Sequence, residues 1–302
     1  MRSPIVWFGG KGQMVKKLLA LLPRHHIYVE AFGGGASLLF AKEPSRVEVY
    51  NDLDSGLVNF FRVLRDPQKF ARFYHLAVLT PWSREEYDYC RKTWQDVEDE
   101  VERAYRWFVV ARMSFSGNFG RSWSACVTHS HNGMASTTSK WLSILREMPM
   151  IHERIMRVQI EHQDFRQLIP HYDTENTLFY LDPPYIPETR KDGGYSCEMS
   201  LVDHAEMVDV LLGIKGMAIL SGYAHPVYNK LEQNGWQRID YSTSCHAVGR
   251  TRQTGVIGPG SAAKKSPRVE SVWLNPAAVA VKSGSQMTIE EVAVADGEGE
   301  AR

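Results

Sequence analysis

The sequence predicts an α/β fold in which a mostly parallel sheet of seven strands is interrupted by a mainly helical insert. Three observations predict this fold. From residue 27 onward, short apolar runs alternate with helix-like segments, as in parallel sheets with helical crossovers. The alternation stops near residue 66 and returns at 158. The returning part contains the apolar run Thr177–Leu181, which indicates a buried strand.

The sheet elements are expected in the following order. A strand over 27–32 ends in three glycines and precedes a helix over 36–42. A second strand over 47–50 stops at Asn51-Asp52 and precedes a helix over 55–65. Further strands are expected at 158–161, 177–181, 217–221, 236–241 and 269–274. One helix is expected to start near 201, before the strand at 217–221, and another to end near 234, after that strand.

The segment between the two parts of the sheet has a different character. Ser83 and Glu86 have the spacing of a capping box, and apolar residues over 101–109 recur at helical spacing. The stretch 114–139 is rich in Ser, Gly, Asn and Thr and is long enough to be a binding loop. We therefore expect a catalytic domain at 1–65 and 158–276, an insert at 66–157, and a disordered acidic tail at 277–302.

Composition excludes several classes of protein. The formal net charge is zero, so any contact with a polyanion must come from local basic patches. The four cysteines are scattered, which argues against a disulfide framework, and Cys126 with His129 and His131 is too weak a pattern to predict a metal. No stretch approaches the ~20 apolar residues of a membrane span, and no signal-peptide core is present. We expect a soluble, cytoplasmic protein without metal.

The first chemical pattern is a glycine turn after the first strand. Gly33-Gly34-Gly35 would allow a tight turn and a close approach to a ligand at the carboxyl edge of the sheet. Asp52 ends the next strand, where a carboxylate can bind ribose hydroxyls. By itself this pattern fits any nucleoside cofactor, NAD included, and also a simple tight turn.

The second pattern is Asp182-Pro183-Pro184-Tyr185, directly after a buried strand. Consecutive prolines cannot extend the hydrogen bonding of a strand, so they form a rigid platform. The Asp182 carboxylate and the Pro183 carbonyl can accept both N–H groups of an exocyclic nucleobase amine, which makes its nitrogen more nucleophilic. Tyr185 can stack on the base. A plain proline turn with a rim aromatic is the alternative.

With these motifs the sequence resembles the Dam-type family of N6-adenine DNA methyltransferases, over about 7–276. The run 7–11 (Trp-Phe-Gly-Gly-Lys), the segment 28–35 and the run 51–54 (Asn-Asp-Leu-Asp) are similar to three family motifs. Residues 163–165 (Gln-Asp-Phe) are similar to its adenine-pocket motif, and 182–185 to its catalytic motif. These motifs stand in the family's order.

The resemblance implies a Rossmann-like fold that binds S-adenosylmethionine. Trp7 and Lys11 would hold the methionine end of the cofactor, Asp52 its ribose, and Asp164 with Phe165 its adenine. Glu30, Phe32, Gly33 and Gly35 would line the pocket. Asp182, Pro183, Pro184 and Tyr185 would be catalytic, and no metal would be needed.

The resemblance also implies that the insert reads double-stranded DNA, and that a cognate restriction endonuclease is a partner such an enzyme can have. Residues 112–121 are only loosely similar to the family's recognition hairpin, so the target sequence stays open. The side chains suited to contact base edges or phosphates are Arg112, Asn118 and Arg121, and Phe115 is suited to wedge into the base stack. An ordinary polar loop is the alternative. A basic stretch at 250–268 is either a solvated hairpin or a phosphate-contacting flap.

The expected reaction is direct methyl transfer to N6 of an adenine flipped out of the duplex. N4-cytosine methylation is the nearest rival, because the two amines have the same electronics. Asp at the first position of the catalytic motif resembles the adenine enzymes. A catalytically silent DNA-binding protein on the same fold is a rival from another class, and an NAD oxidoreductase is a distant third.

Overall fold

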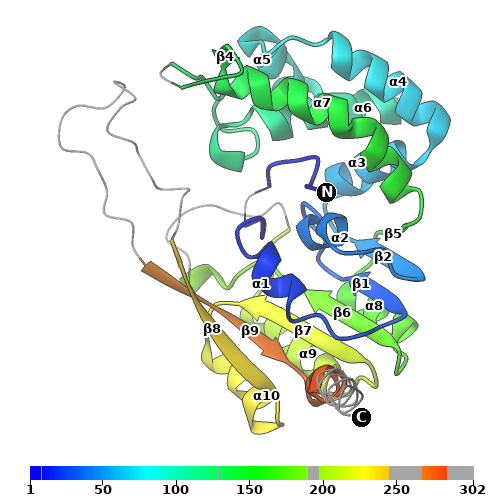
Figure 1. Cartoon of the computed structure of the whole chain (residues 1–302), viewed down its shortest axis with the longest axis vertical. Helices are drawn as coiled ribbons and strands as arrows, with labels where there is room; N and C mark the ends of the chain where they lie inside the picture. Colours follow the sequence, from blue (N-terminus) through cyan, green and yellow to red (C-terminus); the bar gives the residue numbers. More distant parts are fainter. Residues whose placement is uncertain (8, 128, 190–196, 245–266, 284–302) are drawn as a thin grey trace, which may run out of the picture.

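The computed structural model describes residues 1–7, 9–127, 129–189, 197–244 and 267–283. Its main sheet has seven strands in the order β5-β2-β1-β6-β7-β9-β8 (Figure 1). The pairs from β5 through β7 are parallel, whereas β9 pairs antiparallel with both β7 and β8. The predicted fold class is therefore confirmed. The strands are β1 (Ile27–Glu30), β2 (Val47–Asn51), β5 (Gln159–Glu161), β6 (Thr177–Leu181), β7 (Met217–Gly222), β8 (Gln237–Ser244) and β9 (Pro267–Leu274).

The register of the central strands brings several chain segments to one edge. Glu30, at the end of β1, is paired with Tyr50 of β2 and with Tyr180 of β6. Leu181, the last residue of β6, is paired with Leu220 of β7. Because these strands are parallel, the loops that follow them all emerge at the same carboxyl edge.

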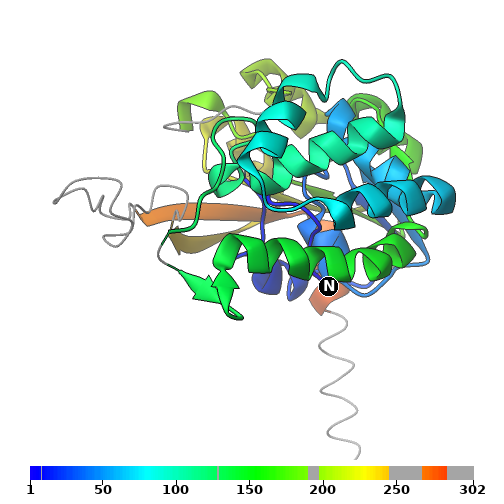
Figure 2. The same ribbon diagram turned by 90° about the horizontal axis from the view of Figure 1, so that it is seen from above.

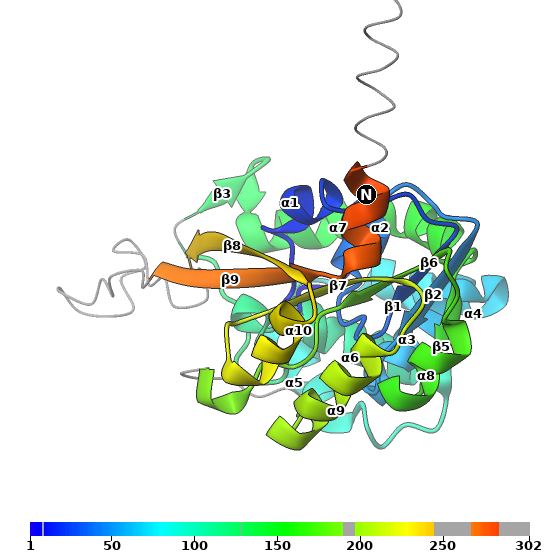
Figure 3. The same cartoon turned by 90° about the horizontal axis from the view of Figure 1, so that it is seen from below.

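Helices cover both faces of the sheet. On one face lie α8 (Phe165–Tyr172), α9 (Leu201–Leu212) and α10 (Asn229–Gln233), and on the other lie α1 (Val15–Leu19) and α2 (Ser37–Ala41) (Figure 3). The alternation of buried strand residues explains this sandwich, since Tyr28 and Tyr180 face one core whereas Val29 and Phe179 face the other. The end of α9 nearest the edge carries a capping box formed by Ser200 and Asp203.

Between β2 and β5 lie the helix over 55–65, which the predicted division counts with the catalytic part, and the predominantly helical insert (upper part of Figure 1). Asp54, Asp66, Ser83 and Asp99 cap these helices by accepting from backbone N–H groups, as Ser83 does from Glu86. The only strands among the described residues of the insert are β3 (Ser130–His131) and β4 (Met134–Ala135). The helices are α3 (Ser55–Arg65), α4 (Pro67–Leu79), α5 (Arg84–Thr93), α6 (Glu100–Met113) and α7 (Ser136–Ile155).

The insert packs against the sheet without a separating layer of solvent. One continuous hydrophobic core contains Phe73 of α4, Phe108 of α6 and Trp141 of α7 together with Tyr50 and Leu178 of the sheet. The rings of Phe60 and Phe108 are stacked with centroids 5.4 Å apart. The predicted boundaries at residues 66 and 157 thus divide the chain in sequence only, because the insert and the sheet share one hydrophobic core.

The carboxyl-terminal end differs from the expectation. Residues 276–283 are helical, and Ala278 is fully buried, so 277–283 do not belong to a disordered tail. Pro276 begins this helix, a position at which proline costs no hydrogen bond. The remainder of the predicted tail, 284–302, and the basic stretch 245–266 lie outside the described residues. Within the described ranges, no helix is both long and apolar enough to cross a bilayer.

Candidate active site

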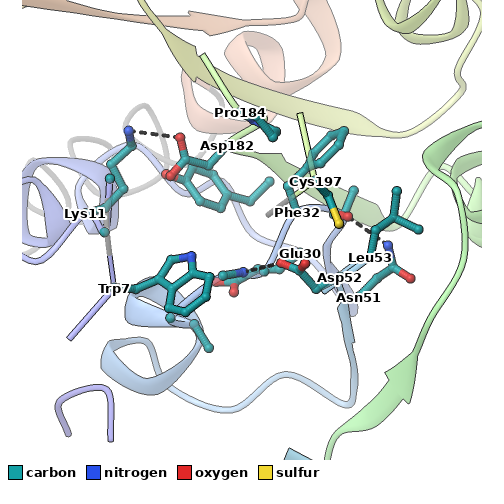
Figure 4. Close-up of a pocket in the computed structure, with 18 of the residues that line it drawn as sticks. Trp7, Lys11, Glu30, Phe32, Asn51, Asp52, Leu53, Asp182, Pro184 and Cys197 are labelled. Atoms are coloured by element: carbon teal, nitrogen blue, oxygen red, sulfur yellow. Dashed lines mark hydrogen bonds and ion pairs between the residues drawn. The ribbon is translucent and has the colours of Figure 1, made fainter. Parts of the chain in front are cut away.

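A pocket opens at the carboxyl edge of β1, β2 and β6, with a volume of about 900 Å³ including the solvent at its mouth. Side chains from the amino-terminal segment, from the ends of β1 and β2 and from the residues after β6 face one another across it (Figure 4). The predicted residues that line it are Trp7, Lys11, Glu30, Phe32, Gly33, Gly35, Asp52, Phe165, Asp182 and Pro184.

The glycine turn forms the floor of the pocket. A Cβ atom at Gly33 would lie 2.2 Å from the ring of Tyr50, and Gly34 has a φ of +46°. The Tyr50 hydroxyl donates to the Gly34 carbonyl over 2.8 Å, which fixes the turn against β2. Glycine is therefore required here both by space and by backbone conformation.

Asp52 lies directly beside this turn. Its Oδ2 accepts from the Gly34 amide over 2.8 Å, and its Oδ1 accepts from the Asp54 amide over 2.8 Å. Burial raises the pKa of Asp52 to about 6 even though these amides oppose the change. A carboxylate held in this way still has lone pairs for two further donors, such as vicinal hydroxyls.

Glu30 is the most buried carboxylate of the pocket, with 2% of its surface exposed. Its Oε1 accepts from the Tyr28 hydroxyl over 2.8 Å and from the Leu39 amide over 2.7 Å. Burial raises the pKa of Glu30 to about 7, against the effect of both donors. Glu30 is thus held rigidly and changes protonation near neutral pH.

The most highly charged part of the site surrounds Lys11. Its Nζ lies 2.9 Å from Asp182 Oδ1 and also contacts Glu270 of β9 and the Tyr185 hydroxyl. Burial lowers the pKa of Lys11, but the carboxylates of Asp182 and Glu270 outweigh it, so the pKa lies above its ordinary value. Lys11 is therefore a fixed cation, and it is bonded to Asp182 rather than pointing freely into the pocket.

Asp182 occupies the end of β6. Its Oδ1 also accepts from the Ser221 hydroxyl of β7 over 3.2 Å. Burial raises the pKa of Asp182 to about 6, while Lys11 opposes that rise. The carboxylate is therefore mostly ionised at neutral pH in a largely buried setting, where its electrostatic interactions are strong.

Tyr185 is placed differently from Asp182 and Pro184. It is buried, and it does not belong to the residues that line the pocket. Its hydroxyl donates to Glu270 Oε1 over 2.7 Å, and its ring packs against Tyr223 with centroids 4.6 Å apart. Pro183 is buried as well. The stacking role of Tyr185 on a base stays a prediction.

Aromatic residues form the walls of the pocket. Phe32 and Phe165 pack with centroids 5.8 Å apart. Trp7, on the opposite side of the glycine turn, packs against Trp107 of α6 at 5.7 Å and against Phe119 at 6.2 Å. The pocket is therefore in direct contact with the insert through Trp7.

Asp164 is the predicted cofactor residue that does not line the pocket. It caps α8 by accepting from the Arg166 amide over 2.9 Å, and it pairs with the Arg166 guanidinium at 2.9 Å. In this structure its role is at the helix terminus, next to the aromatic wall formed by Phe165.

Sequence reasoning missed several residues of the site. Asn51 joins the ends of β1 and β2 to the 161–164 loop: its Nδ2 donates to Ala31 and Gln163 carbonyls over 2.8 and 2.9 Å. A buried asparagine at a strand end was the available signal. Glu270 had none, because it lies far along the chain from Lys11. Lining residues that had no predicted role include Tyr180, Cys197, Glu198 and Met199, and also Asn51, Leu53 and Gln163, which stand within the motif runs 51–54 and 163–165.

The predicted DNA-contacting residues lie after or at the end of α6. Phe115 is 54% exposed and Arg121 is exposed. They belong to a loop closed by a bridge between Ser114 and Trp123, and the Asn118 side-chain Nδ2 donates to the Phe115 carbonyl over 3.4 Å. Arg112 is instead packed against α7, where it donates to the Lys140 carbonyl over 3.4 Å.

The antiparallel hairpin of the insert is at 130–135, outside the stretch 112–121 that the sequence suggested. Asn132 and Gly133 form its turn with φ of 53° and 72°, a conformation that these residue types favour. The hairpin projects from the helical layer (Figure 2), and His131 and Asn132 are exposed. In the described part of the chain, no three His, Cys, Asp or Glu residues are arranged to hold a metal ion.

Comparison with known proteins gives the following relatives. The type II methyltransferase M1.LlaDCHI of Lactococcus lactis subsp. cremoris is 28% identical over 247 residues, 74% of this chain and 82% of that protein. The DNA N-6-adenine-methyltransferase of Escherichia phage P1 is 24% identical over 64% of this chain, and the modification methylase StsI of Streptococcus sanguinis is 22% identical over 63%. The aligned parts are only 25% and 29% of those two proteins.

A solved structure, an rRNA methylase from Streptococcus thermophilus, aligns over 87% of this chain and 94% of its own with 12% identity and a TM-score of 0.32. The sequence model of D12 class N6 adenine-specific DNA methyltransferases matches residues 7–226, a range that runs from Trp7 in the pocket wall past Asp182 and through the whole insert. On that match, the chain belongs to the D12 class N6 adenine-specific DNA methyltransferase family.

Proposed function

We propose that this protein transfers a methyl group from S-adenosylmethionine to N6 of an adenine that is flipped out of double-stranded DNA. The observation that carries the proposal is the position of Asp182. Its carboxylate stands at the rim of the same pocket that the glycine turn and Asp52 line. One cavity thus combines features suited to a nucleoside cofactor with an acceptor for an amine.

The residues of the pocket fit S-adenosylmethionine. The glycine turn lines the pocket without side chains of its own, and Asp52 beside it is suited to the ribose hydroxyls. Phe32 and Phe165 offer apolar surface to an adenine ring. When bound, S-adenosylmethionine supplies an electrophilic methyl group on a sulfonium. The carboxylates of Asp52 and Asp182, with pKa values of about 6, are mostly ionised at neutral pH and suit that positive charge.

Asp182 has two tasks in this proposal. It accepts an N–H bond from the adenine amine, and it stabilises the positive charge that develops on nitrogen as the methyl group arrives. Lys11 and Ser221 both bind Oδ1, so Oδ2 is the oxygen left for the amine among the described contacts. The Pro183 carbonyl is the second acceptor. The pocket's rigidity then contributes by positioning.

The adenine must leave the helix to reach this site, because Asp182 lies at the edge of a pocket and a stacked base is inaccessible. We assign DNA contact to the insert. Phe115 and Arg121 of the loop and His131 and Asn132 of the hairpin offer exposed side chains suited to bases or phosphates, and Asn118 of the loop is partly exposed. Arg112 would support the loop from beneath rather than contact DNA.

The names of the relatives suggest a partner activity. The terms type II methyltransferase and modification methylase describe enzymes of restriction-modification systems. We therefore propose that a restriction endonuclease of the same specificity is the partner activity of this enzyme.

The function is tested by identifying the methylated base. Duplex DNA is incubated with the full-length protein and S-adenosylmethionine carrying a deuterated methyl group, then digested to nucleosides and analysed by mass spectrometry. Labelled N6-methyldeoxyadenosine is expected. Labelled N4-methyldeoxycytidine would assign the rival cytosine reaction, and no labelled nucleoside despite cofactor binding would make the protein a silent DNA-binding one.

A further inference from the structure

We propose that Glu270 is a positioning residue of the methyl-transfer site: it shares the Lys11 ammonium with Asp182 and anchors Tyr185, so that Lys11 does not occupy Asp182 alone and an oxygen of Asp182 stays available to accept the substrate amine. The inference rests on the proposed function and adds a residue to its machinery. Glu270 lies on β9, outside the residues 7–226 that the family's model matches.

Glu270 contacts Lys11, which lines the pocket, without lining the pocket itself. Its Oε1 accepts from the Tyr185 hydroxyl over 2.7 Å, and its carboxylate pairs with the Lys11 ammonium. Lys11 in turn lies 2.9 Å from Asp182 and 4.5 Å from the centre of the Tyr185 ring. One side chain thus fixes both the cation and the aromatic residue next to the catalytic carboxylate.

The charges explain why a second carboxylate matters. Among the described residues, the carboxylates paired with Lys11 are Asp182 and Glu270. All three side chains are largely buried, at 5% exposure for Lys11, 18% for Asp182 and 11% for Glu270. If Asp182 alone held the buried Lys11 ammonium, the ammonium would neutralise the charge of Asp182. It would also compete with the substrate amine for the lone pairs of Asp182. Two carboxylates around one ammonium leave a net negative site where positive charge develops.

The pairing of β9 explains how Glu270 reaches the site. Ser271, next to Glu270, is paired with Gly222 of β7, and Glu270 itself is paired with Tyr241 of β8. The antiparallel strand therefore delivers a carboxylate to the carboxyl edge of the parallel strands. Its contacts there are with Lys11 and Tyr185, which both belong to the proposed site.

Several other groups face Asp182, and the test variants must leave these residues unchanged. They are Lys11 from the amino-terminal segment, Glu30 of β1, Tyr180 of β6, Ser221 of β7 and Tyr228. The negative charge of Glu270 raises the pKa of Asp182, whereas Lys11 lowers it. Removal of that one charge should therefore move the protonation of Asp182 to lower pH.

The experiment compares Glu270→Gln with Glu270→Asp in the full-length protein. The glutamine keeps an acceptor for Tyr185 but loses the charge, and the aspartate keeps the charge. We measure kcat and KM for methylation of duplex DNA from pH 5 to 9, with the melting temperature. For Glu270→Gln we expect kcat to fall by at least about tenfold with KM for DNA nearly unchanged. The acid limb of its kcat profile should move to lower pH.

Glu270→Asp should keep the acid limb of the wild type. Asp240→Asn, a change of a carboxylate on the neighbouring strand β8 outside the pocket, is the matched control and should leave kcat and the limb unchanged. An unshifted limb and wild-type kcat in Glu270→Gln would overturn the proposal, as would unfolding of both Glu270 variants, which would make the residue structural. Absence of adenine methylation by the wild type would instead overturn the proposed function itself.

Discussion

Trp7 and Phe119 connect the pocket to the insert, with their ring centroids 6.2 Å apart. Trp7 lines the pocket, whereas Phe119 belongs to the loop that carries Phe115 and Arg121. Phe119 also packs on Trp107 at 5.4 Å and on Trp94 at 5.7 Å. A ligand that orders Trp7 therefore also restrains the loop assigned to DNA contact.

This contact predicts coupling between cofactor and DNA. Phe119→Ala should weaken binding of S-adenosylhomocysteine by about fivefold, although Phe119 does not line the pocket, because Trp7 loses its support. Any gain in DNA affinity on cofactor binding should also shrink, and the gain in cofactor affinity on DNA binding should shrink by the same factor as that gain. Calorimetry with and without a DNA duplex measures both. Wild-type cofactor affinity in this variant would show that the two sites are independent.

Asp52 should contribute to cofactor affinity directly. Asp52→Ala is expected to weaken S-adenosylhomocysteine binding by about tenfold to a hundredfold, since charged hydrogen bonds contribute roughly 1.5–3 kcal/mol. Isothermal calorimetry on wild type and variant gives the dissociation constants, with Asp88→Ala on the exposed surface of α5 as control. Tight NAD binding and none of S-adenosylhomocysteine would contradict the assignment of this pocket.

Glu30 predicts a pH dependence of stability. Its pKa rises from 4.5 unfolded to about 7 folded, because of burial. Such a group stabilises the folded state fully below 4.5, and this contribution is lost as the pH rises through 7. Between pH 4.5 and 8 the loss is on the order of 2–3 kcal/mol.

Glu30→Gln should remove this dependence, because the amide stays neutral. Urea unfolding at pH 5 and pH 8 should therefore show a smaller stability difference for this variant than for wild type. Glu43→Gln changes an exposed carboxylate nearby and should behave as wild type. Equal pH dependence in all three proteins would mean that Glu30 is not protonated in the folded state near neutral pH.

Much of this site followed from local sequence patterns, for a physical reason. Asp52 and Asp182 both end strands of one parallel sheet, so their strands deliver them to the same edge. Glu270 was missed because its place depends on the antiparallel pairing and register of β9. Local pattern also cannot tell whether Asp164 caps a helix or binds a ligand. The contact of Arg112 with a carbonyl of α7 was likewise beyond local patterns, since the sequence does not show which helices pack together.

Arg121 tests the DNA-contacting loop. If it reads a base, Arg121→Ala should cost roughly 1–3 kcal/mol of binding at the proper site and relax preference at one position. If it contacts phosphate, binding should weaken on all sequences with a shallower salt dependence. Titrations on matched and mismatched duplexes at two salt concentrations separate these outcomes. Arg72→Ala, on α4, is the control, and unchanged affinity and specificity in Arg121→Ala would remove this residue from the interface.

The most direct test of the central claim is methyl transfer by Asp182→Ala. We expect tritium transfer from labelled S-adenosylmethionine to duplex DNA to fall by at least about a thousandfold, because the site loses the charged acceptor that stabilises the reacting nitrogen. Asp209→Ala, which removes an exposed carboxylate of α9, should transfer as wild type does. Transfer by Asp182→Ala within tenfold of wild type, at equal cofactor occupancy, would contradict the assignment of Asp182 and with it the proposed mechanism.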